Sequence, residues 1–408
     1  MKHSYLVALT GSGGTVPPEL GVVRRLVERG HRVTVLAEES LATAVTATGA
    51  RLRSRAGSGF ARDTAAEIDS ERPDLVLASY FAFGAMVAAQ AREIPFMALI
   101  PGIYPLPVEG GPPPGTGFGR AGGPVGRWRD RLVGSMVQRR WDQELLPQLN
   151  ALRADFGLER LAHYQDQVQL AHRQLVLSSE AFDFAAQRPD AVRYVGPILD
   201  DPIWARDAEW TVPEGSEPLV LVSLSSTDQG QGECLQRIAD ALGKLPVRGV
   251  MTTGPAVPVT AVCAPPNVTV LPAGPHHELM RHASLVITHG GHGTLLKSFA
   301  ADLPVVLLPH GRDHADNAAR VRAHHAGVAL PRTATPQQIA TAVRKALRTP
   351  AHYRAAAELG RVLRRDAMSD LLMNELEPAA DHPDPIFAAS ASTRAGHWHP
   401  DSNHELES

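Results

Sequence analysis

The sequence contains one turn with the composition of an anion-binding site, His289-Gly290-Gly291-His292-Gly293-Thr294. The turn follows a short apolar run, Leu285 to Thr288, and precedes an amphipathic helical pattern that Pro304 ends. Glycines let backbone N–H groups approach an anion closely, and a helix that begins at Gly293 points its positive dipole end to the same place. This strand–turn–helix pattern therefore predicts a phosphate-binding loop.

A second polar cluster follows the next apolar run, Val305 to Leu308. The turn and this cluster fit two consecutive motifs, His-x-Gly-x-x-Thr and Pro-x-x-x-Asp-(Gln/His)-x-x-Asn. The residues at the named positions are His289, Gly291, Thr294, Pro309, Asp313, His314 and Asn317. Together they closely resemble the donor-site signature of the family-one nucleotide-sugar glycosyltransferases of GT-B fold, of the bacterial type that modifies antibiotics and macrolides.

The resemblance implies an inverting glycosyltransferase that moves a sugar from a UDP- or dTDP-linked donor to a small natural-product acceptor. It implies that Asp313 and His314 bind sugar hydroxyls, with His314 in place of the more usual glutamine. The residues implied for the donor diphosphate are His289, Gly291, Gly293, Thr294, Ser225 and Ser226. Hydroxyls at the carboxyl end of a strand suit phosphate, although simple turn chemistry explains the two serines nearly as well. His276 is the candidate nucleobase contact, because the aromatic that relatives carry there is missing.

The same resemblance exposes a gap at the general base. Relatives use a histidine and an aspartate, and this chain has Thr15 and Ser79 at the corresponding positions. A hydroxyl does not take up a proton near neutral pH, so three explanations stay open. First, another acid, Glu19 or Glu109, serves as the base. Second, the acceptor is a group that needs little deprotonation, such as an acidic phenol, a thiol or a hydroxylamine. Third, the protein catalyses no transfer. We favour the second explanation.

Two rival functions share this fold. A non-catalytic nucleotide-sugar-binding or auxiliary protein would explain the absent dyad. A sugar-nucleotide epimerase fits the motif from Pro309 to Asn317 less well than a transferase does. Zinc is a further alternative, since His289 with His292 and His310 with His314 have usable spacings. The glycines between the first pair and the lack of a glutamate that completes a hydrolase motif argue against a metal, and we expect no cofactor besides the nucleotide sugar.

Composition favours a cytoplasmic enzyme of two or three domains. The 408 residues are 44% hydrophobic and 20% charged, with a net charge of −3, which gives no reason to expect nucleic acid or an anionic membrane. Two cysteines argue against a disulfide framework. No apolar run approaches the roughly 18 residues that span a bilayer. We expect a monomer or homodimer whose partners are the nucleotide sugar and the acceptor.

Alternating strand and helix patterns begin at Tyr5 and predict an α/β fold with two Rossmann-like domains whose parallel sheets face each other across a cleft. We expect an acceptor domain at 1–198, a linker at 199–218, a nucleotide-sugar domain at 219–348, helices at 349–377 that cross back to the first domain, and a disordered tail at 378–408.

Three stretches of the first domain have weaker patterns. Residues 51–71 are expected to be a brief polar connection, and the proline- and glycine-rich segment 101–126 is either a flexible connector or a lid over the acceptor. Residues 127–156 are expected to be mainly helical. In that helix the core is the preferred location for Trp128, Leu132, Met136 and Trp141, with an acceptor-facing position as the alternative.

Overall fold

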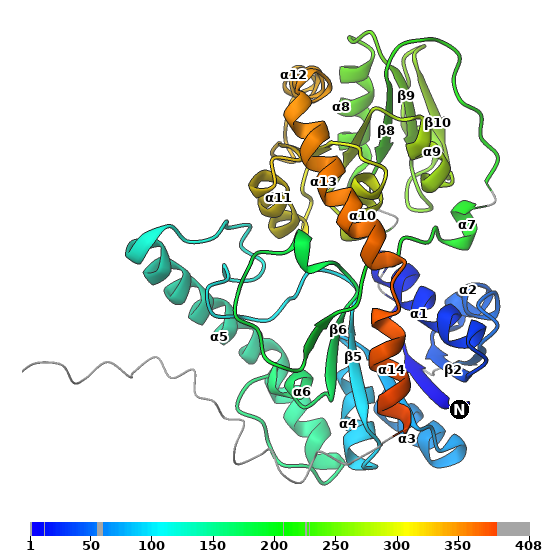
Figure 1. Cartoon of the computed structure of the whole chain (residues 1–408), viewed down its shortest axis with the longest axis vertical. Coiled ribbons are helices and arrows are strands. Elements are labelled where there is room, and N and C mark those ends of the chain that lie inside the picture. Colours follow the sequence, from blue (N-terminus) through cyan, green and yellow to red (C-terminus); the bar gives the residue numbers. More distant parts are fainter. Residues whose placement is uncertain are drawn as a thin grey trace, which may run out of the picture.

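A computed structural model describes residues 2–11, 13–54, 60–206, 208–224, 227 and 229–381. In this part of the chain two α/β domains lie one above the other, and the last helices cross their junction (Figure 1). Each domain is built on a sheet of parallel strands, which confirms the expected architecture.

The first sheet has the strand order β3-β2-β1-β4-β5-β6-β7 within the described residues, and its pairings are parallel. The strands are β1 Ser4–Ala8, β2 Arg32–Ala37, β3 Arg51–Ser54, β4 Leu75–Ser79, β5 Phe96–Ile100, β6 Arg173–Val176 and β7 Val192–Tyr194. The strand order reverses direction between β1 and β4, and in open α/β sheets the crevice at the carboxyl ends of such strands is where ligands bind. Thr10 follows β1 and Ser79 ends β4, so both hydroxyls lie at this crevice.

Helices cover both faces of the first sheet. They are α1 Val16–Glu28, α2 Ala42–Thr46, α3 Phe60–Glu71, α4 Phe83–Ala91, α5 Gly123–Asp155 and α6 Asp166–Gln169, with short 3₁₀ turns η1 Gly13–Thr15, η2 Glu39–Leu41 and η3 Glu180–Phe182. Alternate residues of β1 point to opposite faces, as in any strand. Tyr5 and Val7 pack in the core beneath α1, whereas Leu6 and Ala8 pack in the core beneath α3 and α4.

Two expectations for this domain are wrong. Residues 51–71 contain β3 and α3 rather than a simple polar connection, and Ile68 of α3 is buried against the sheet. The first part of the long helix α5 extends away from the body of the domain (Figure 1), whereas Leu149 near its end is buried in a small core with Val87 and Tyr164. Trp128, Leu132 and Met136 are 66%, 47% and 61% exposed, and Trp141 is 39% exposed.

The second sheet has the order β10-β9-β8-β11-β12-β13 in the described part of the chain, again with parallel pairings. Its strands are β8 Leu219–Ser223, β9 Arg248–Thr252, β10 Val268–Leu271, β11 Leu285–Thr288, β12 Val305–Leu307 and β13 Gly327–Ala329. Its helices are α8 Gly232–Leu242, α9 His276–His282, α10 His292–Ala300, α11 His314–Ala323 and α12 Pro336–Arg348, with the turn η4 Val259–Ala261. The order reverses between β8 and β11, so the glycine turn after β11 lies at the second switch point.

The linker and the C-terminal helices join the two domains. The linker carries one short helix, α7 Ile203–Arg206, and α13 Pro350–Ala367 packs along α10 before reaching the first domain. There α14 Leu371–Asp381 contributes Leu372 and Leu376 to the core beneath α1. The helix thus continues four residues into the segment expected to be disordered, and the remainder of that segment, 382–408, lies outside the described residues.

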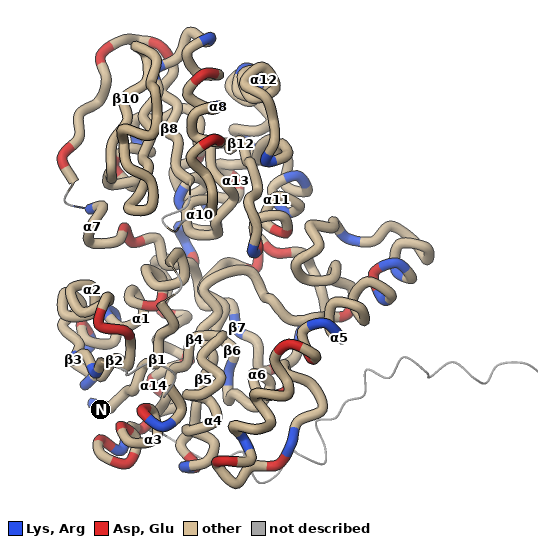
Figure 2. Tube along the Cα trace, turned by 180° about the vertical axis from the view of Figure 1, so that it is seen from behind, with Lys and Arg blue, Asp and Glu red and all other residues tan. Residues whose placement is uncertain are grey.

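Charge and hydropathy agree with the sequence analysis. Figure 2 shows acidic and basic residues interspersed over both domains. No helix in the described ranges combines the length and the apolar character that crossing a membrane requires.

Candidate active site

A cavity of about 650 Å³ lies between the two domains. Thr10 and Ser79 line it from the carboxyl edge of the first sheet, and Ser223 and His289 line it from the carboxyl edge of the second. The two switch points therefore face one shared space. Ser225 and Ser226 lie outside the described residues, although their neighbours Ser223, Leu224 and Thr227 line the cavity.

The glycine turn has a conformation that explains its sequence. Gly290 has φ +93°, a left-handed backbone conformation that side chains other than hydrogen disfavour. A Cβ atom at Gly291 would lie 2.5 Å from His289 Nε2, so the histidine ring requires glycine there. Helix α10 begins at His292, one residue earlier than expected, and Gly293 and Thr294 of its first turn line the cavity. Nothing lies within 4 Å of where a Gly293 Cβ would be, which leaves the backbone open to a ligand.

The histidines of this wall are neutral near pH 7. Burial lowers the pKa of His289 well below its ordinary value, and the neighbouring His314 and His310 lower it further. Burial likewise brings the pKa of His314 to about 4. The two rings meet edge to face with centroids 4.4 Å apart. In this state His289 carries no fixed charge, and a bond to the Ser223 backbone opposes the lowering of its pKa.

Asn317 ties the two motifs together, a role that sequence reasoning did not assign to it. Its Nδ2 donates to the carbonyl oxygen of Gly290 at 2.9 Å and to Asp313 Oδ2, also at 2.9 Å. The side chain thereby fixes the start of α11 against the glycine turn. Burial raises the pKa of Asp313, and the bond from Asn317 opposes that shift. Asp313 and His314 both line the cavity.

The opposite wall carries hydroxyls and aromatic rings. Ser79 is buried, with its Oγ 3.2 Å from Thr10 Oγ1, and Thr15 lines the cavity from the start of α1. Aromatic residues on this side that sequence reasoning did not place at the site are Tyr80, Phe81 and Tyr164. Trp141 lines the same cavity, so the alternative that it faces the acceptor region describes it better than a core position.

The two acids considered as substitute bases differ in position. Glu109 is exposed, its backbone pairs with Gln187, and it does not line the cavity. Glu19 is fully buried in the first turn of α1, and neither carboxyl oxygen has a hydrogen-bond partner. Burial raises the pKa of Glu19 to about 8, and the Ser79 hydroxyl partly opposes that shift.

The cavity is also lined by a residue of α9 and by an aromatic residue of the linker. His276 Nε2 lies 3.2 Å from Thr252 Oγ1, and burial lowers the pKa of His276 to about 4. Trp204, on α7 of the linker, is 50% exposed and lines the same cavity. The linker thus supplies an aromatic ring to the cavity, whereas the only ring of the segment 273–276 that could stack on a base is that of His276.

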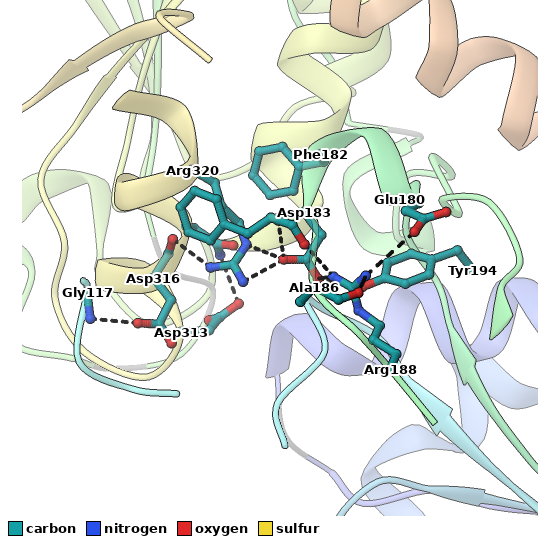
Figure 3. A network of polar contacts seen from close by, with 12 residues as sticks. Gly117, Glu180, Phe182, Asp183, Ala186, Arg188, Tyr194, Asp313, Asp316 and Arg320 are labelled. Carbon is teal, nitrogen blue, oxygen red and sulfur yellow. Dashed lines mark hydrogen bonds and ion pairs between the residues drawn. The ribbon is translucent and has the colours of Figure 1, made fainter. Parts of the chain in front are cut away.

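Helix α11 connects the donor-side motif to the first domain through two polar contacts (Figure 3). Asp316 accepts hydrogen bonds from the backbone N–H groups of Gly115 and Gly117, both at 2.6 Å. Four residues later, Arg320 Nε donates to the buried Asp183 Oδ1 at 2.7 Å. Although burial alone would raise the pKa of Asp183, the charges of Arg320 and Arg188 and a bond from Tyr194 bring it below its ordinary value. The segment 101–126 is therefore held against the second domain.

In the described residues no group of three or more His, Cys, Asp or Glu side chains is arranged to hold a metal ion.

Comparisons with known proteins agree with this geometry. A family described as erythromycin biosynthesis protein CIII-like, C-terminal domain, matches residues 237–376. The chain is 26% identical to 4'-demethylrebeccamycin synthase of Lentzea aerocolonigenes over 91% of its own length and 98% of that protein. It is 28% identical to oleandomycin glycosyltransferase of Streptomyces antibioticus over 75% of this chain and 74% of that protein. The solved structure of CalG4, the calicheamicin glycosyltransferase, matches with a TM-score of 0.74 at 23% identity, covering 93% of this chain and 99% of that one.

Proposed function

We propose that this chain, which belongs to the family-one nucleotide-sugar glycosyltransferases of GT-B fold and antibiotic type, transfers a sugar from a UDP- or dTDP-linked donor to a small natural-product acceptor. The acceptor oxygen attacks the anomeric carbon as the diphosphate departs from the opposite side, so the configuration inverts. The observation that carries the proposal is the single cavity that joins the glycine turn after β11 to the hydroxyls at the ends of β1 and β4.

We call the side of the cavity that is lined by His289, Gly293 and Thr294 of the second domain the donor wall. It has the groups that a departing diphosphate needs. The first turn of α10 presents backbone N–H groups and the positive end of the helix dipole to the cavity. Thr294 adds a hydroxyl, and the ring of His289 lines the same side of the cavity. Because these donors are already oriented, they stabilise the negative charge that develops on the leaving group. Ser225 and Ser226 belong to the same proposed diphosphate set.

The proposed roles of Asp313 and His314 concern the sugar. A carboxylate accepts hydrogen bonds from sugar hydroxyls, and the bond from Asn317 orients Asp313 for this task. His276 and Trp204, which line the same cavity, are proposed to contact the nucleobase. The acceptor would lie among the rings of Tyr80, Phe81, Trp141 and Tyr164, with Thr15 and Ser79 beside the reacting hydroxyl.

A donor panel tests this proposal. The protein is incubated with UDP- and dTDP-sugars, with and without a library of phenolic and aliphatic acceptors, and released nucleoside diphosphate and glycosylated product are measured. Acceptor-dependent release with an inverted product supports the transfer. Donor binding without product in any combination would support the non-catalytic alternative and overturn the proposed reaction.

One substitution separates the two halves of the donor site. Asp313→Asn removes the carboxylate but keeps the size of the side chain. Charge-assisted hydrogen bonds contribute about 1.5–3 kcal/mol, so the affinity for the sugar nucleotide should fall about 10- to 100-fold while the affinity for free nucleoside diphosphate is retained. Equal losses for both ligands would show that Asp313 does not recognise the sugar.

A further inference from the structure

Glu19 is a buried ionisable group for which the folded chain provides no charged partner. The side chain is fully buried, and both carboxyl oxygens lack a hydrogen bond. Buried polar groups are nearly always paired, because an unpaired one loses its interactions with water and gains nothing in return. A methionine or a leucine would fill the same space without that cost. Stability therefore does not account for a carboxyl group at this position.

Its position relative to the cavity suggests the reason. Glu19 belongs to the first turn of α1, and Thr15, Pro17 and Pro18 of the same segment line the cavity. Ser79, which also lines the cavity, is close enough to Glu19 for its hydroxyl to influence the carboxyl. Glu19 does not line the cavity, so the Ser79 hydroxyl is its link to a bound acceptor.

No charged group is among the influences on the Glu19 carboxyl. Its pKa is raised to about 8 by burial, with the Ser79 hydroxyl as the opposing influence. Thr10, at the end of β1, bonds to Ser79. The acid Glu38, after β2, lies beside Gly11 instead. On α1 itself, Arg24 and Arg25 bind Asp200 of the linker.

Other carboxylates at the cavity are already occupied. Asp313 accepts a hydrogen bond from Asn317, and Asp316 accepts two from backbone N–H groups of the segment 101–126. Asp200 binds two arginines. The histidines His276, His289, His292 and His314 belong to the second domain, on the donor side of the cavity. We call the side of the cavity that is lined by Thr10, Thr15 and Ser79 of the first domain the acceptor wall. Among the described acids next to this wall, Glu19 is the one whose carboxyl oxygens are not engaged by an arginine, an amide or a backbone N–H group.

We propose that Glu19 is the terminal proton acceptor of the transfer, and that the Ser79 hydroxyl relays the proton to it from the acceptor. The proposal rests on the glycosyltransferase function proposed above. In the relay, Ser79 Oγ takes the proton of the acceptor hydroxyl while its own proton moves to the Glu19 carboxylate. The acceptor oxygen forms its bond to the anomeric carbon, and the bond from that carbon to the diphosphate oxygen breaks, its electron pair leaving with the diphosphate.

The resting contacts are compatible with such a relay. Ser79 Oγ is 3.2 Å from Thr10 Oγ1, and a serine hydroxyl hydrogen can rotate between neighbouring acceptors. An acceptor hydroxyl that reaches Ser79 would compete with Thr10 and turn the serine proton towards Glu19. The arrangement exchanges the positions found in relatives, because here the hydroxyl that lines the cavity is at the end of β4 and the carboxyl group is on α1. Glu19 acts through Ser79 and is therefore a positioning and proton-accepting residue rather than a substrate contact.

The test compares Glu19→Gln, Glu19→Asp and Ser79→Ala with the unaltered protein. The pH dependence of kcat/KM is measured with an aliphatic alcohol and with phenols of graded pKa. We expect kcat/KM for the unaltered protein to rise with pH up to about 8, where Glu19 becomes ionised. Glu19→Gln should lose this rising limb and be roughly 10²- to 10⁴-fold slower with the alcohol, the usual contribution of a positioned base.

Two further readouts distinguish a relay from a structural role. In Glu19→Gln the rate should depend more steeply on the pKa of the phenol, since the acceptor must then ionise without help, and Glu19→Asp should restore part of the limb. The double variant Glu19→Gln/Ser79→Ala should be no slower than the slower single variant, because the two groups act in one path. Glu67→Gln is the control: it makes the same change on α3, at an acid that does not line the cavity, whose Oε2 is buried without a hydrogen bond and whose Oε1 pairs with Arg53, and the activity should not change.

Donor binding keeps this test separate from that of the proposed function. Nucleoside diphosphate affinity should be the same for the unaltered protein and Glu19→Gln. If neither binds nucleotide or forms product, the proposed function fails. If the unaltered protein is active and Glu19→Gln keeps both its rate and its pH profile, the relay is overturned and the acidic-acceptor explanation stands.

Discussion

Asp200 and Asp201 are neighbours in the chain, yet their carboxylates bind opposite domains. Asp200 Oδ2 accepts from Arg24 on α1 at 2.8 Å, whereas Asp201 Oδ1 accepts from Lys297 on α10 at 2.6 Å. Asp201 Oδ2 also accepts from the backbone N–H of His277 at the start of α9. Two adjacent residues of the linker thus contact α1 of the first domain and α10 of the second. The pair is therefore one of the links between the two domains.

Replacement of Asp201 should destabilise the protein more than replacement of Asp200. The side chains of Asp201 and Lys297 are 6% and 11% exposed, whereas those of Asp200 and Arg24 are 30% and 25% exposed. Asp201→Asn leaves a nearly buried ammonium group without its counter-ion, which typically costs about 3–5 kcal/mol. Asp200→Asn breaks a partly solvated pair and should cost about 1 kcal/mol or less. Urea denaturation of both variants measures the difference, and equal losses would show that Lys297 finds another partner.

Nucleotide binding should be accompanied by protonation of His289. Because His289 is neutral before binding, with its pKa held well below the ordinary value by burial, a diphosphate beside it should raise that pKa. Affinity for UDP or dTDP should therefore increase as pH falls from 7 to 5, with proton uptake on binding. His289→Ala should weaken binding about 10- to 100-fold at pH 6 and remove the proton uptake. Calorimetry in buffers of different ionisation enthalpy measures both quantities, and unchanged affinity would make His289 a turn residue that merely packs on Gly291.

The contacts of Asp316 should govern the acceptor rather than the donor. Asp316→Asn replaces one of the two oxygens that hold Gly115 and Gly117 with an amide nitrogen, which cannot accept a hydrogen bond. The segment 101–126 should loosen, because it loses at least one charge-assisted bond. We expect a several-fold higher KM for the acceptor, faster limited proteolysis within 101–126, and unchanged nucleotide affinity. A weaker nucleotide affinity with an unchanged KM for the acceptor would instead show that Asp316 acts by stabilising α11 and the donor site, and not by holding the segment 101–126.

Short-range patterns predicted the elements that depend on neighbouring residues. The glycine turn at 289–294 and the strand before it were predicted because Gly290 and Gly291 answer local backbone requirements that are visible in the sequence. Parallel sheets followed from alternating apolar runs and amphipathic helices. The sequence did not predict the part of α14 beyond residue 377 or the strand at 51–54. The local patterns there are weak, and packing against distant parts of the chain supports both elements.

Long-range packing determined what the sequence could not predict. Trp204 and Tyr164 reach the cavity from segments without a motif, and a pattern of helical spacing does not reveal whether Trp128 faces a core or solvent. Glu19 was a candidate base by its distance from Thr15 along the chain, but a carboxyl group in the first turn of a helix is ordinarily solvated. Only the tertiary structure shows it buried near Ser79 without a charged partner.

The buried carboxyl of Glu19 makes a prediction about stability that does not depend on any substrate. Its pKa of about 8 in the folded protein exceeds the ordinary value of 4.5, so the folded chain retains a proton that the unfolded chain releases between these values. The corresponding stabilisation is complete below about pH 4.5 and is lost as pH rises to about 8. The loss is about 1.4 kcal/mol per pH unit, on the order of 5 kcal/mol over the whole interval.

Glu19→Gln removes this titration because an amide does not ionise. Near pH 5 the protonated acid and the amide are similar buried polar groups, so the two proteins should unfold with similar free energies. The variant should become progressively more stable than the unaltered protein as pH rises from 5 to 8. Urea denaturation at pH 5, 6, 7 and 8 measures the difference, which should widen at each step and then level off. Two parallel curves would mean that the Glu19 carboxyl reaches water or a partner in solution, and a carboxyl group of that kind would have no need of Ser79 to receive a proton.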